Sequence, residues 1–178
     1  MQDIRIKKVE SKSDLMTFIK CQWNFYKNDP FWVPPLIMER KTLLNKEKNP
    51  FFHNASADYF IAYRNNEIVG RIAAIKNDIH LKHHNDNSGF WGFFESINDQ
   101  QVANALFDTA KKWLKEKGLT RMLGPANPSS NDEWAMLLEG FDDSPRLLMT
   151  YNPKYYLALC ENYGMTKAKD LLAYKLEN

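Results

Sequence analysis

The chain has 178 residues, which is enough for one folded domain with a proper core and marginal for two. Hydrophobic residues make up 44% of the chain and aromatic residues 13%, which excludes a disordered protein. The net charge is +2, from 24 basic and 22 acidic residues, so the charge balance disfavours nucleic acid or a membrane surface as a partner.

The cysteine content and the apolar pattern bear on the cellular compartment. Cys21 and Cys160 lie far apart without a CxxC spacing, which predicts reduced thiols. No apolar run approaches the roughly 20 residues that span a bilayer. Residues 1–6 lack the apolar core of a signal peptide. We therefore predict a cytoplasmic protein with no membrane partner.

The N-terminal part is predicted to hold one strand and two helices. Residues 4–10 alternate apolar and charged side chains, which predicts a short strand. A helix is predicted from a serine cap, Ser11 or Ser13, to about Lys27, and another helix after Pro35. The first helix places a set of larger side chains on one stripe: Leu15, Phe18, Ile19, Gln22, Trp23 and Tyr26.

The central part is predicted to contain a hairpin and an exposed connection. Residues 49–53 are predicted as loop, and 57–63 and 67–76 as two strands. Asn65-Asn66 is the expected turn between these strands. Residues 77–87 are polar and hold three of the four histidines, so we expect them to be exposed.

A strand that leads directly into a helix is the unit around which we organise the chain. Residues 88–97 are aromatic and β-prone, and 100–117 have helical periodicity. Asn98 is the expected N-cap, with Gln101 three residues later, and Gly118 is the expected stop. The apolar face of this helix is predicted to consist of Val102, Ala103, Leu106, Phe107, Ala110, Trp113 and Leu114.

The remaining elements complete an α/β chain. A strand is predicted at 120–123, a polar loop at 124–133, a short helix at 134–138, a strand at 147–149, a helix at 151–163 and a final strand at 168–176. Hairpins lie early in this order and crossovers late. The order predicts a mixed α/β sheet with helices on both faces.

Several segments resemble the GCN5-related N-acetyltransferase (GNAT) superfamily. Residues 67–75 resemble its central hairpin strand, 105–118 its long helix, and 155–165 its late "Y…E-x-Y-G-F" helix end. A group of uncharacterised bacterial GNAT-like proteins is more similar still. The strings that carry this closer likeness are 29–35, 90–95, 124–133 and 151–156. We predict one GNAT-like domain over 1–178. Because members of that group are often about twice as long, the alternative is that the chain is the N-terminal half of a longer protein.

The resemblance implies a site for acetyl-CoA or another acyl-CoA as co-substrate. In this family the central strand holds the pantetheine arm, and a Q/R-x-x-G-x-G/A motif at the strand–helix junction holds the pyrophosphate. The cofactor-binding residues implied here are Phe94, Ser96, Ile97, Gln101, Val102 and Ala103.

The motif is altered in this chain. Over the matching positions, 98–103, only Ala103 fits the family pattern. Gln101 replaces a glycine that would let the backbone approach a phosphate closely, and Asp99 adds a negative charge there. Two interpretations follow: either the cofactor site is degenerate, or side chains elsewhere hold the phosphates.

Four residues are candidates for the acid–base steps. The resemblance implies a base that removes the amine proton, for which Glu95 and Glu133 are the candidates. It also implies a tyrosine that protonates the departing thiolate, either Tyr151 or Tyr156. As alternatives, Glu95 faces solvent and the tyrosines are core aromatics.

The loop at 124–133 is the candidate acceptor site, because a long polar loop after a strand is typical of ligand contact. Asn127, Asn131 and Asp132 are its candidate substrate-binding residues, together with Trp32 from the aromatic–proline segment. The alternatives are an ordinary capped loop, with Glu133 in the first turn of a helix, and a tryptophan that packs against the first helices.

The histidine cluster does not predict a metal site. His80, His83 and His84 have ligand-like spacing, but neither a cysteine nor a second acidic cluster accompanies them. We predict no metal and an exposed polar loop.

The predicted function is acyl-CoA-dependent N-acetyl transfer to a small-molecule amine whose identity the sequence does not reveal. The alternative is a GNAT-fold half-domain with a degenerate cofactor site, which binds a ligand or plays a structural role. The expected macromolecular partner is a second copy in a homodimer or a partner GNAT-like domain. Nucleic acid is not expected as a partner.

Overall fold

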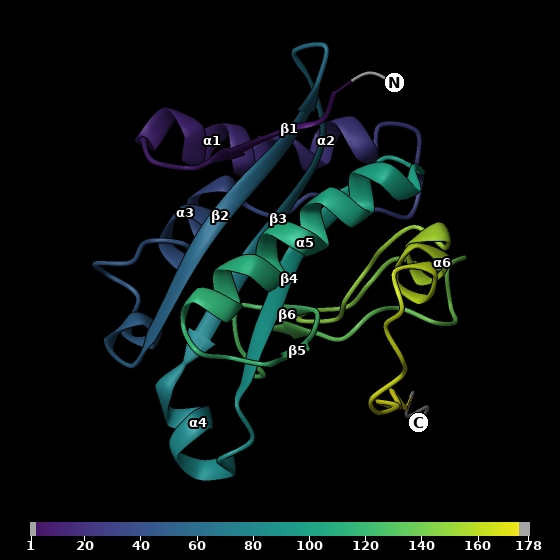
Figure 1. Cartoon of the computed structure of the whole chain (residues 1–178). Coiled ribbons are helices and arrows are strands. Elements are labelled where there is room, and N and C mark those ends of the chain that lie inside the picture. Colours follow the sequence, from purple (N-terminus) through teal and green to yellow (C-terminus); the bar gives the residue numbers. More distant parts are fainter. Residues whose placement is uncertain (1–2, 175–178) are drawn as a thin grey trace.

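The computed structural model describes residues 3–174, and its centre is a mixed five-stranded sheet with the order β1-β2-β3-β4-β5 (Figure 1). The strands are β1 (Arg5–Lys8), β2 (Ala55–Arg64), β3 (Glu67–Asn77), β4 (Ser88–Ser96) and β5 (Arg121–Leu123). Neighbours from β1 to β4 run antiparallel, and β5 runs parallel to β4. β6 (Ala126–Asn127) and β7 (Glu133–Trp134) form a separate antiparallel pair.

Helices cover both faces of this sheet. The helical segments are α1 (Lys12–Lys20), α2 (Gln22–Phe25), α3 (Ile37–Leu43), a 3-10 helix (Pro50–His53), α4 (Asp78–His84), α5 (Gln100–Glu116) and α6 (Tyr155–Asn162). Figure 1 shows α5 across one face and α1, α2 and α3 on the other. Each layer has its own buried cluster, with Leu106 and Ile72 in one and Phe18 and Ile61 in the other. The predicted α/β class, a mixed sheet with helices on both faces, is confirmed.

The strand–helix unit was predicted well from local pattern. All seven residues of the predicted apolar face of α5 are buried. Gly118 has a φ of +76° just after the helix, as expected for a stop. The cap, however, is Asp99 rather than Asn98, because the Asp99 side chain accepts hydrogen bonds from the backbone N–H groups of Gln101 and Val102.

The hairpin turn is also confirmed. Asn65 and Asn66 have φ values of 50° and 65°, the left-handed conformation that a tight β-hairpin turn requires. At the N-terminus, Ser11 is the cap, and it forms a reciprocal capping box with Asp14. The predicted long first helix is interrupted at Cys21, because the Asn24 N–H bonds to the Cys21 carbonyl with tighter, three-residue spacing.

Two predicted loops contain helical turns. Residues 77–87 include α4, whose first N–H groups bond to the side chain of Asn77, the N-cap. Pro50 begins a 3-10 turn in the segment predicted as loop, because its fixed φ suits the first helical position. Local capping chemistry therefore overrides the polar composition in both segments.

The predictions for the C-terminal part were the least accurate. The helix predicted at 134–138 is wrong, because Trp134 pairs in β7, and the strand predicted at 147–149 is an exposed loop. Residues 168–174 form no strand, and the rest of that predicted element lies outside the described residues. Short apolar runs do not distinguish strand from loop when no neighbouring strand is known. The last predicted helix exists, but it begins only at Tyr155.

Candidate functional site

β4 and β5 form a wedge that opens beyond their short region of pairing. The two strands pair only from Ser88–Phe90 against residues 121–123, whereas β4 continues to Ser96. The chain then leaves β5 through Gly124-Pro125. Beyond Phe90, β4 has no further pairing with β5, and the backbone groups of Phe93 and Ser96 bond instead to side chains.

A β-bulge marks the middle of this edge. Phe93 has a φ of 47°, and the register between β3 and β4 shifts at the same place. The Phe93 N–H donates to Asn127 Oδ1 at 2.6 Å. A Cβ atom on Gly92 would lie 1.6 Å from the Ala126 carbonyl oxygen, so only glycine permits this close approach.

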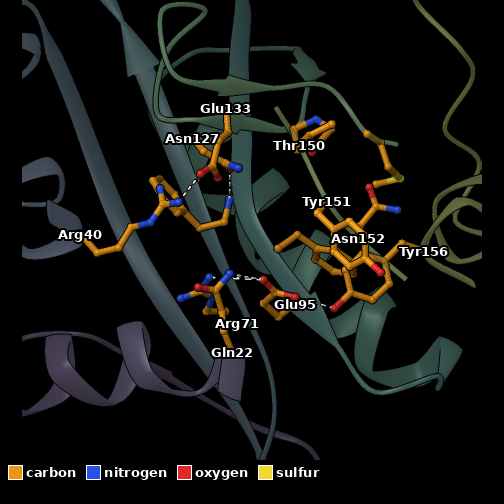
Figure 2. A pocket seen from close by; sticks show the side chains of 14 residues that line it. Gln22, Arg40, Arg71, Glu95, Asn127, Glu133, Thr150, Tyr151, Asn152 and Tyr156 are labelled. Atoms are coloured by element: carbon orange, nitrogen blue, oxygen red, sulfur yellow. Dashed lines mark hydrogen bonds and ion pairs between the residues drawn. The ribbon is translucent and has the colours of Figure 1, made fainter. Parts of the chain in front are cut away.

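Glu95 is the centre of a buried polar cluster (Figure 2). Its side chain is 5% exposed and accepts from Gln22 Nε2 at 2.6 Å and from the Tyr26 and Tyr156 hydroxyls at 2.9 and 2.7 Å. A guanidinium nitrogen of Arg71 lies 3.4 Å from the same carboxylate. Burial, followed by the charge of Glu95, raises the pKa of Tyr26 and Tyr156 well above the usual value, so both hydroxyls are protonated at neutral pH.

Arg71 is fixed by groups other than its carboxylate partner. It donates to the Phe18 carbonyl at 2.5 Å, and its guanidinium lies over the Phe18 ring at 4.8 Å from the centroid. Its Nε is buried and has no hydrogen-bond partner. The positive charge is therefore held in the interior beside Glu95.

Two adjacent tyrosines of α6 complete the edge of β4. The Tyr156 hydroxyl accepts from the Ser96 N–H at 2.9 Å, and the Tyr155 hydroxyl donates to the Ser96 carbonyl at 2.8 Å. These side chains bond where a pairing strand would otherwise bond. Burial, followed by the charge of Glu95, raises the pKa of Tyr155 to about 12.

The opposite side of the pocket is formed by a second carboxylate and its partner. Glu133 of β7 forms an ion pair with Arg40 of α3 and keeps 29% of its side chain exposed. Nearby, Asp132 accepts from the Ser129 hydroxyl at 2.6 Å, while Asn131 is exposed. Of the two carboxylates of this pocket, Glu133 is thus the one that solvent or a ligand can reach.

Tyr151 joins two distant segments. Its hydroxyl donates to both carboxylate oxygens of Asp29, at 2.8 and 2.9 Å. Burial, followed by the hydrogen bond to Asp29, raises the pKa of Tyr151 to about 12. Trp32 stacks on Tyr26, with ring centroids 4.9 Å apart.

Comparison with known proteins identifies the family. The model of the acetyltransferase (GNAT) family matches residues 13–137. The chain belongs to the GNAT acetyltransferase family.

Curated relatives of this GNAT domain are bacterial. It is 36% identical to Protein YghO of Escherichia coli K12 over 94% of this chain and 43% of that protein. It is also 36% identical to the bacterial ceramide synthase of Caulobacter vibrioides, over 98% of this chain and 46% of that protein. The chain therefore spans less than half the length of these two relatives.

Solved structures agree on the fold. A predicted acetyltransferase of Clostridium acetobutylicum with acetyl-CoA has a TM-score of 0.57 at 15% identity, over 97% of this chain and 96% of that one. An aminoglycoside acetyltransferase from an uncultured soil sample, in complex with sisomicin, has a TM-score of 0.56 at 12% identity, over 98% and 96%. At such identities the likeness shows the GNAT fold alone.

The GNAT domain brings six of the predicted site residues to one pocket. They are Phe94, Glu95, Asn127, Glu133, Tyr151 and Tyr156. Figure 2 shows the two carboxylates on opposite sides, Glu95 beside Arg71 and Glu133 beside Arg40. Ser96 lies at the end of the same β4 edge, where its backbone is bonded to the two tyrosines of α6.

Other predicted residues lie outside the pocket lining. The Trp32 ring stacks on the Tyr26 ring. The Ile97 N–H donates to the Val69 carbonyl of β3. Val102 and Ala103 are buried in the core beneath α5, and Gln101 is exposed. The roles predicted for these residues stay predictions.

Sequence reasoning missed the five other polar side chains of the lining. They are Gln22, Arg40, Arg71, Thr150 and Asn152. Asn152 is buried and accepts from the Leu137 N–H at 2.7 Å, so it fixes one end of the loop beside the pocket. Arg71 could have been found from sequence, because it is a charged residue within the apolar run of β3 and a buried charge needs a partner.

Residues 3–174 show neither a metal-binding cluster nor a membrane-spanning helix. No cluster of three or more histidine, cysteine or acidic side chains occurs there in an arrangement that suits a metal ion. None of the helices in that range has the length and apolar character needed to cross a bilayer. His80 instead packs against Phe90 and lies 3.1 Å from an Asp86 carboxylate oxygen.

Proposed function

We propose that this domain transfers an acyl group from an acyl-CoA to an amine. The observation that carries the proposal is the wedge between β4 and β5, with both candidate carboxylates and both candidate tyrosines on the pocket that it opens into. In an α/β sheet, ligands bind at the carboxyl ends of parallel strands where the strands diverge. Family membership supports acyl transfer in general.

Glu133 is the proposed base. All of the donors around Glu95 are already directed at its two oxygens, whereas Glu133 has one ion-pair partner, Arg40, and a partly exposed side chain. In the proposed step, a C–N bond forms between the amine and the thioester carbon, and the C–S bond breaks. The amine proton passes to Glu133.

Tyr156 is the proposed acid for the departing thiolate. Its hydroxyl lies on the edge of β4 at Ser96, beside the wedge, and its raised pKa keeps it protonated. Both hydroxyls donate to a carboxylate, that of Tyr156 to Glu95 and that of Tyr151 to Asp29, but only that of Tyr156 also bonds to the edge of β4. Solvent returns the proton from Glu133 to Tyr156 after product release. We place Glu95 and Arg71 as positioning residues that orient the Tyr156 hydroxyl.

The proposed acceptor is an amine that carries an alkyl chain. The relative in Caulobacter is named a ceramide synthase, and ceramides are amides. Two segments beside the pocket, 29–40 and 133–151, are joined by the Asp29–Tyr151 and Arg40–Glu133 contacts. These two segments contain most of the large apolar side chains that are exposed in the described chain: Val33, Leu36, Met38, Leu138, Leu147, Leu148 and Met149.

A second candidate function is a GNAT-fold half-domain that binds a ligand or a partner without acyl transfer. The capping of α5 by Asp99 favours it, because that carboxylate occupies N–H groups which the family resemblance assigns to the pyrophosphate. The single-domain assignment, the cytoplasmic location and a homodimer or partner domain likewise stay predictions.

The test is an acyl-transfer assay with acetyl- and longer acyl-CoA donors against primary amines of increasing chain length. We expect amide formation that Glu133→Gln reduces at least about a hundredfold, the usual contribution of a general base. Glu139→Gln, in the segment that follows β7 and exposed, is the matched control and should retain activity. Absence of amide product with every donor and amine would overturn the proposal in favour of the half-domain.

The chain-length preference has its own control. Leu147→Ser should raise the KM for long-chain amines and leave that for short amines unchanged, because Leu147 is 91% exposed on the segment that leads to Thr150 and Tyr151 of the pocket. Ile79→Ser, on exposed α4 at the far end of β4, should change neither value (Figure 1). Equal KM values for short and long amines in the wild type would exclude an alkyl acceptor.

A further inference from the structure

The start of α5 is already occupied by a carboxylate of the chain itself. The Gln101 and Val102 N–H groups donate to Asp99 Oδ1 at 2.8 and 3.3 Å. The family resemblance assigns this junction to the pyrophosphate of acyl-CoA. A phosphate oxygen would have to accept from the same N–H groups, so the two anions compete for one place.

The other oxygen of Asp99 is also engaged. Arg64 at the end of β2 donates to Asp99 Oδ2 at 2.8 Å. This hydrogen bond from Arg64 is the main reason that the pKa of Asp99 lies below its usual value, so the carboxylate is charged at neutral pH. Arg64, a cation that could attract a phosphate, is therefore already paired, and the residues at the start of α5 do not fit a pyrophosphate.

The wedge between β4 and β5 differs from the start of α5 in the groups that a ligand would have to displace. Along β4, the backbone groups of Phe93 and Ser96 bond to side chains, namely Asn127, Tyr155 and Tyr156. Asn127 and Tyr155 are only partly buried, so their side chains can rotate away and the amides of a pantetheine arm can take over their hydrogen bonds, while Tyr156 stays bonded to Glu95. Displacing Asp99 would instead remove the cap of α5 and bring two anions together.

We infer that the domain recognises its acyl donor through the acyl-pantetheine arm and not through the pyrophosphate, with Asp99 as the residue that sets this specificity. The inference rests on the proposed acyl transfer and deepens it. A pantetheine thioester without the nucleotide is then as good a donor as acyl-CoA. The arm can come from CoA or from a carrier protein that bears phosphopantetheine, and the test separates the two.

The test is equilibrium binding to the whole chain by calorimetry, with CoA, pantetheine and a purified holo acyl carrier protein as probes. For the wild type we expect Kd values for CoA and pantetheine that agree within about threefold, a small difference in binding free energy. Binding of the carrier protein at least about tenfold tighter than pantetheine would identify a carrier as the source of the arm. Carrier binding no tighter than pantetheine would identify CoA.

Asp99→Gly tests the role of the carboxylate directly. Glycine is tolerated as an N-cap, so α5 should remain folded while its N–H groups and Arg64 become available. We expect the CoA Kd to fall about tenfold, with the pantetheine Kd unchanged. Ser11→Gly, which removes the equivalent cap of α1, is the matched control and should change neither Kd.

Two results would overturn the inference, and they differ in what they say of acyl transfer. Wild-type binding of CoA about thirtyfold or more tighter than pantetheine, weakened by salt, would show pyrophosphate recognition and leave acyl transfer intact. Binding of none of the three probes at millimolar concentration would overturn the proposed function together with the inference. Asp99→Gly that weakens CoA binding would overturn the role of Asp99 alone.

Discussion

Two arginine–carboxylate pairs in this GNAT domain occupy contrasting surroundings. Arg64 and Asp99 are 2.8 Å apart, with side chains 19% and 27% exposed, whereas Arg71 and Glu95 are 3.4 Å apart and only 4% and 5% exposed. Asp99 otherwise bonds to the backbone of its own helix. Glu95 instead gathers side chains from α2 and the residue after it, from β3 and from α6.

The contrast shows how the surroundings give one chemical pair two different tasks. A carboxylate that caps a helix satisfies backbone groups and excludes other anions from that place. A carboxylate that is buried and hydrogen-bonded from several elements fixes the positions of the hydroxyls around it. The first pair thus closes the start of α5, and the second builds one side of the pocket.

Breaking the buried pair should have the largest effect. Glu95→Leu leaves the Arg71 charge buried without a partner, so we expect the free energy of unfolding to fall by about 3–5 kcal/mol. Urea denaturation followed by circular dichroism measures this. The double variant Glu95→Leu with Arg71→Met should recover most of the loss. A single variant within about 1 kcal/mol of wild type would contradict the view of Glu95 as the centre of the cluster.

Removing one hydroxyl from the same cluster should have an intermediate effect. Tyr156→Phe leaves the buried Ser96 N–H without an acceptor, which should lower the free energy of unfolding by about 1–3 kcal/mol. Tyr155→Phe is the matched control, because it removes the neighbouring hydroxyl, which is not bonded to Glu95. Only Tyr156→Phe should also reduce acyl transfer; equal losses of activity would argue against its role as the acid.

The partly exposed Arg64–Asp99 pair should contribute less to the free energy of unfolding, and its contribution should depend on pH. Asp99→Ala should lower the free energy of unfolding by about 1 kcal/mol at pH 7 through loss of the cap. The pKa of Asp99 is lowered in the folded protein, chiefly by the hydrogen bond from Arg64. The carboxylate therefore contributes fully to the free energy of unfolding above the unfolded-state pKa of about 3.9. This contribution is lost as the pH falls through the folded value. Chemical denaturation from pH 7 into the acid range measures it; a difference between variant and wild type that does not shrink as the pH falls below about 3.9 would contradict the assignment.

The smallest effect should come from the neighbouring residue that local pattern favoured as the cap. Asn98→Ala should change the free energy of unfolding by less than about 0.5 kcal/mol, as is usual for an exposed surface position. The same denaturation measurement applies. A loss as large as that of Asp99→Ala would mean that Asn98 shares the capping role.

The elements that sequence predicted well depend on local rules. The buried face of α5 and the Asn65-Asn66 turn follow from periodicity and turn chemistry over a few residues. The choice between Asn98 and Asp99 failed because both are good caps, and only the path of the chain from β4 decides between them. The strand predicted at 147–149 failed because no partner strand lies beside it in the described chain.

The residues that line the candidate pocket could be named from sequence only in part. Glu95, Glu133, Tyr151 and Tyr156 were named from the family resemblance and their residue types, and all four line the pocket, while their roles stay predictions. Gln22 and Tyr26 were placed on the correct helical stripe, but their contact with Glu95 joins residues 73 and 69 positions apart. Contacts over such separations follow from the tertiary fold, and local pattern does not contain them.

Chemical-shift mapping with acetyl-CoA on the isotope-labelled chain tests the central claim most directly. We predict that saturable shifts concentrate at residues 93–97 on the edge of β4, while the amides of Gln101 and Val102 at the start of α5 keep their positions. Shifts centred on the start of α5, or none at millimolar acetyl-CoA, would contradict the account.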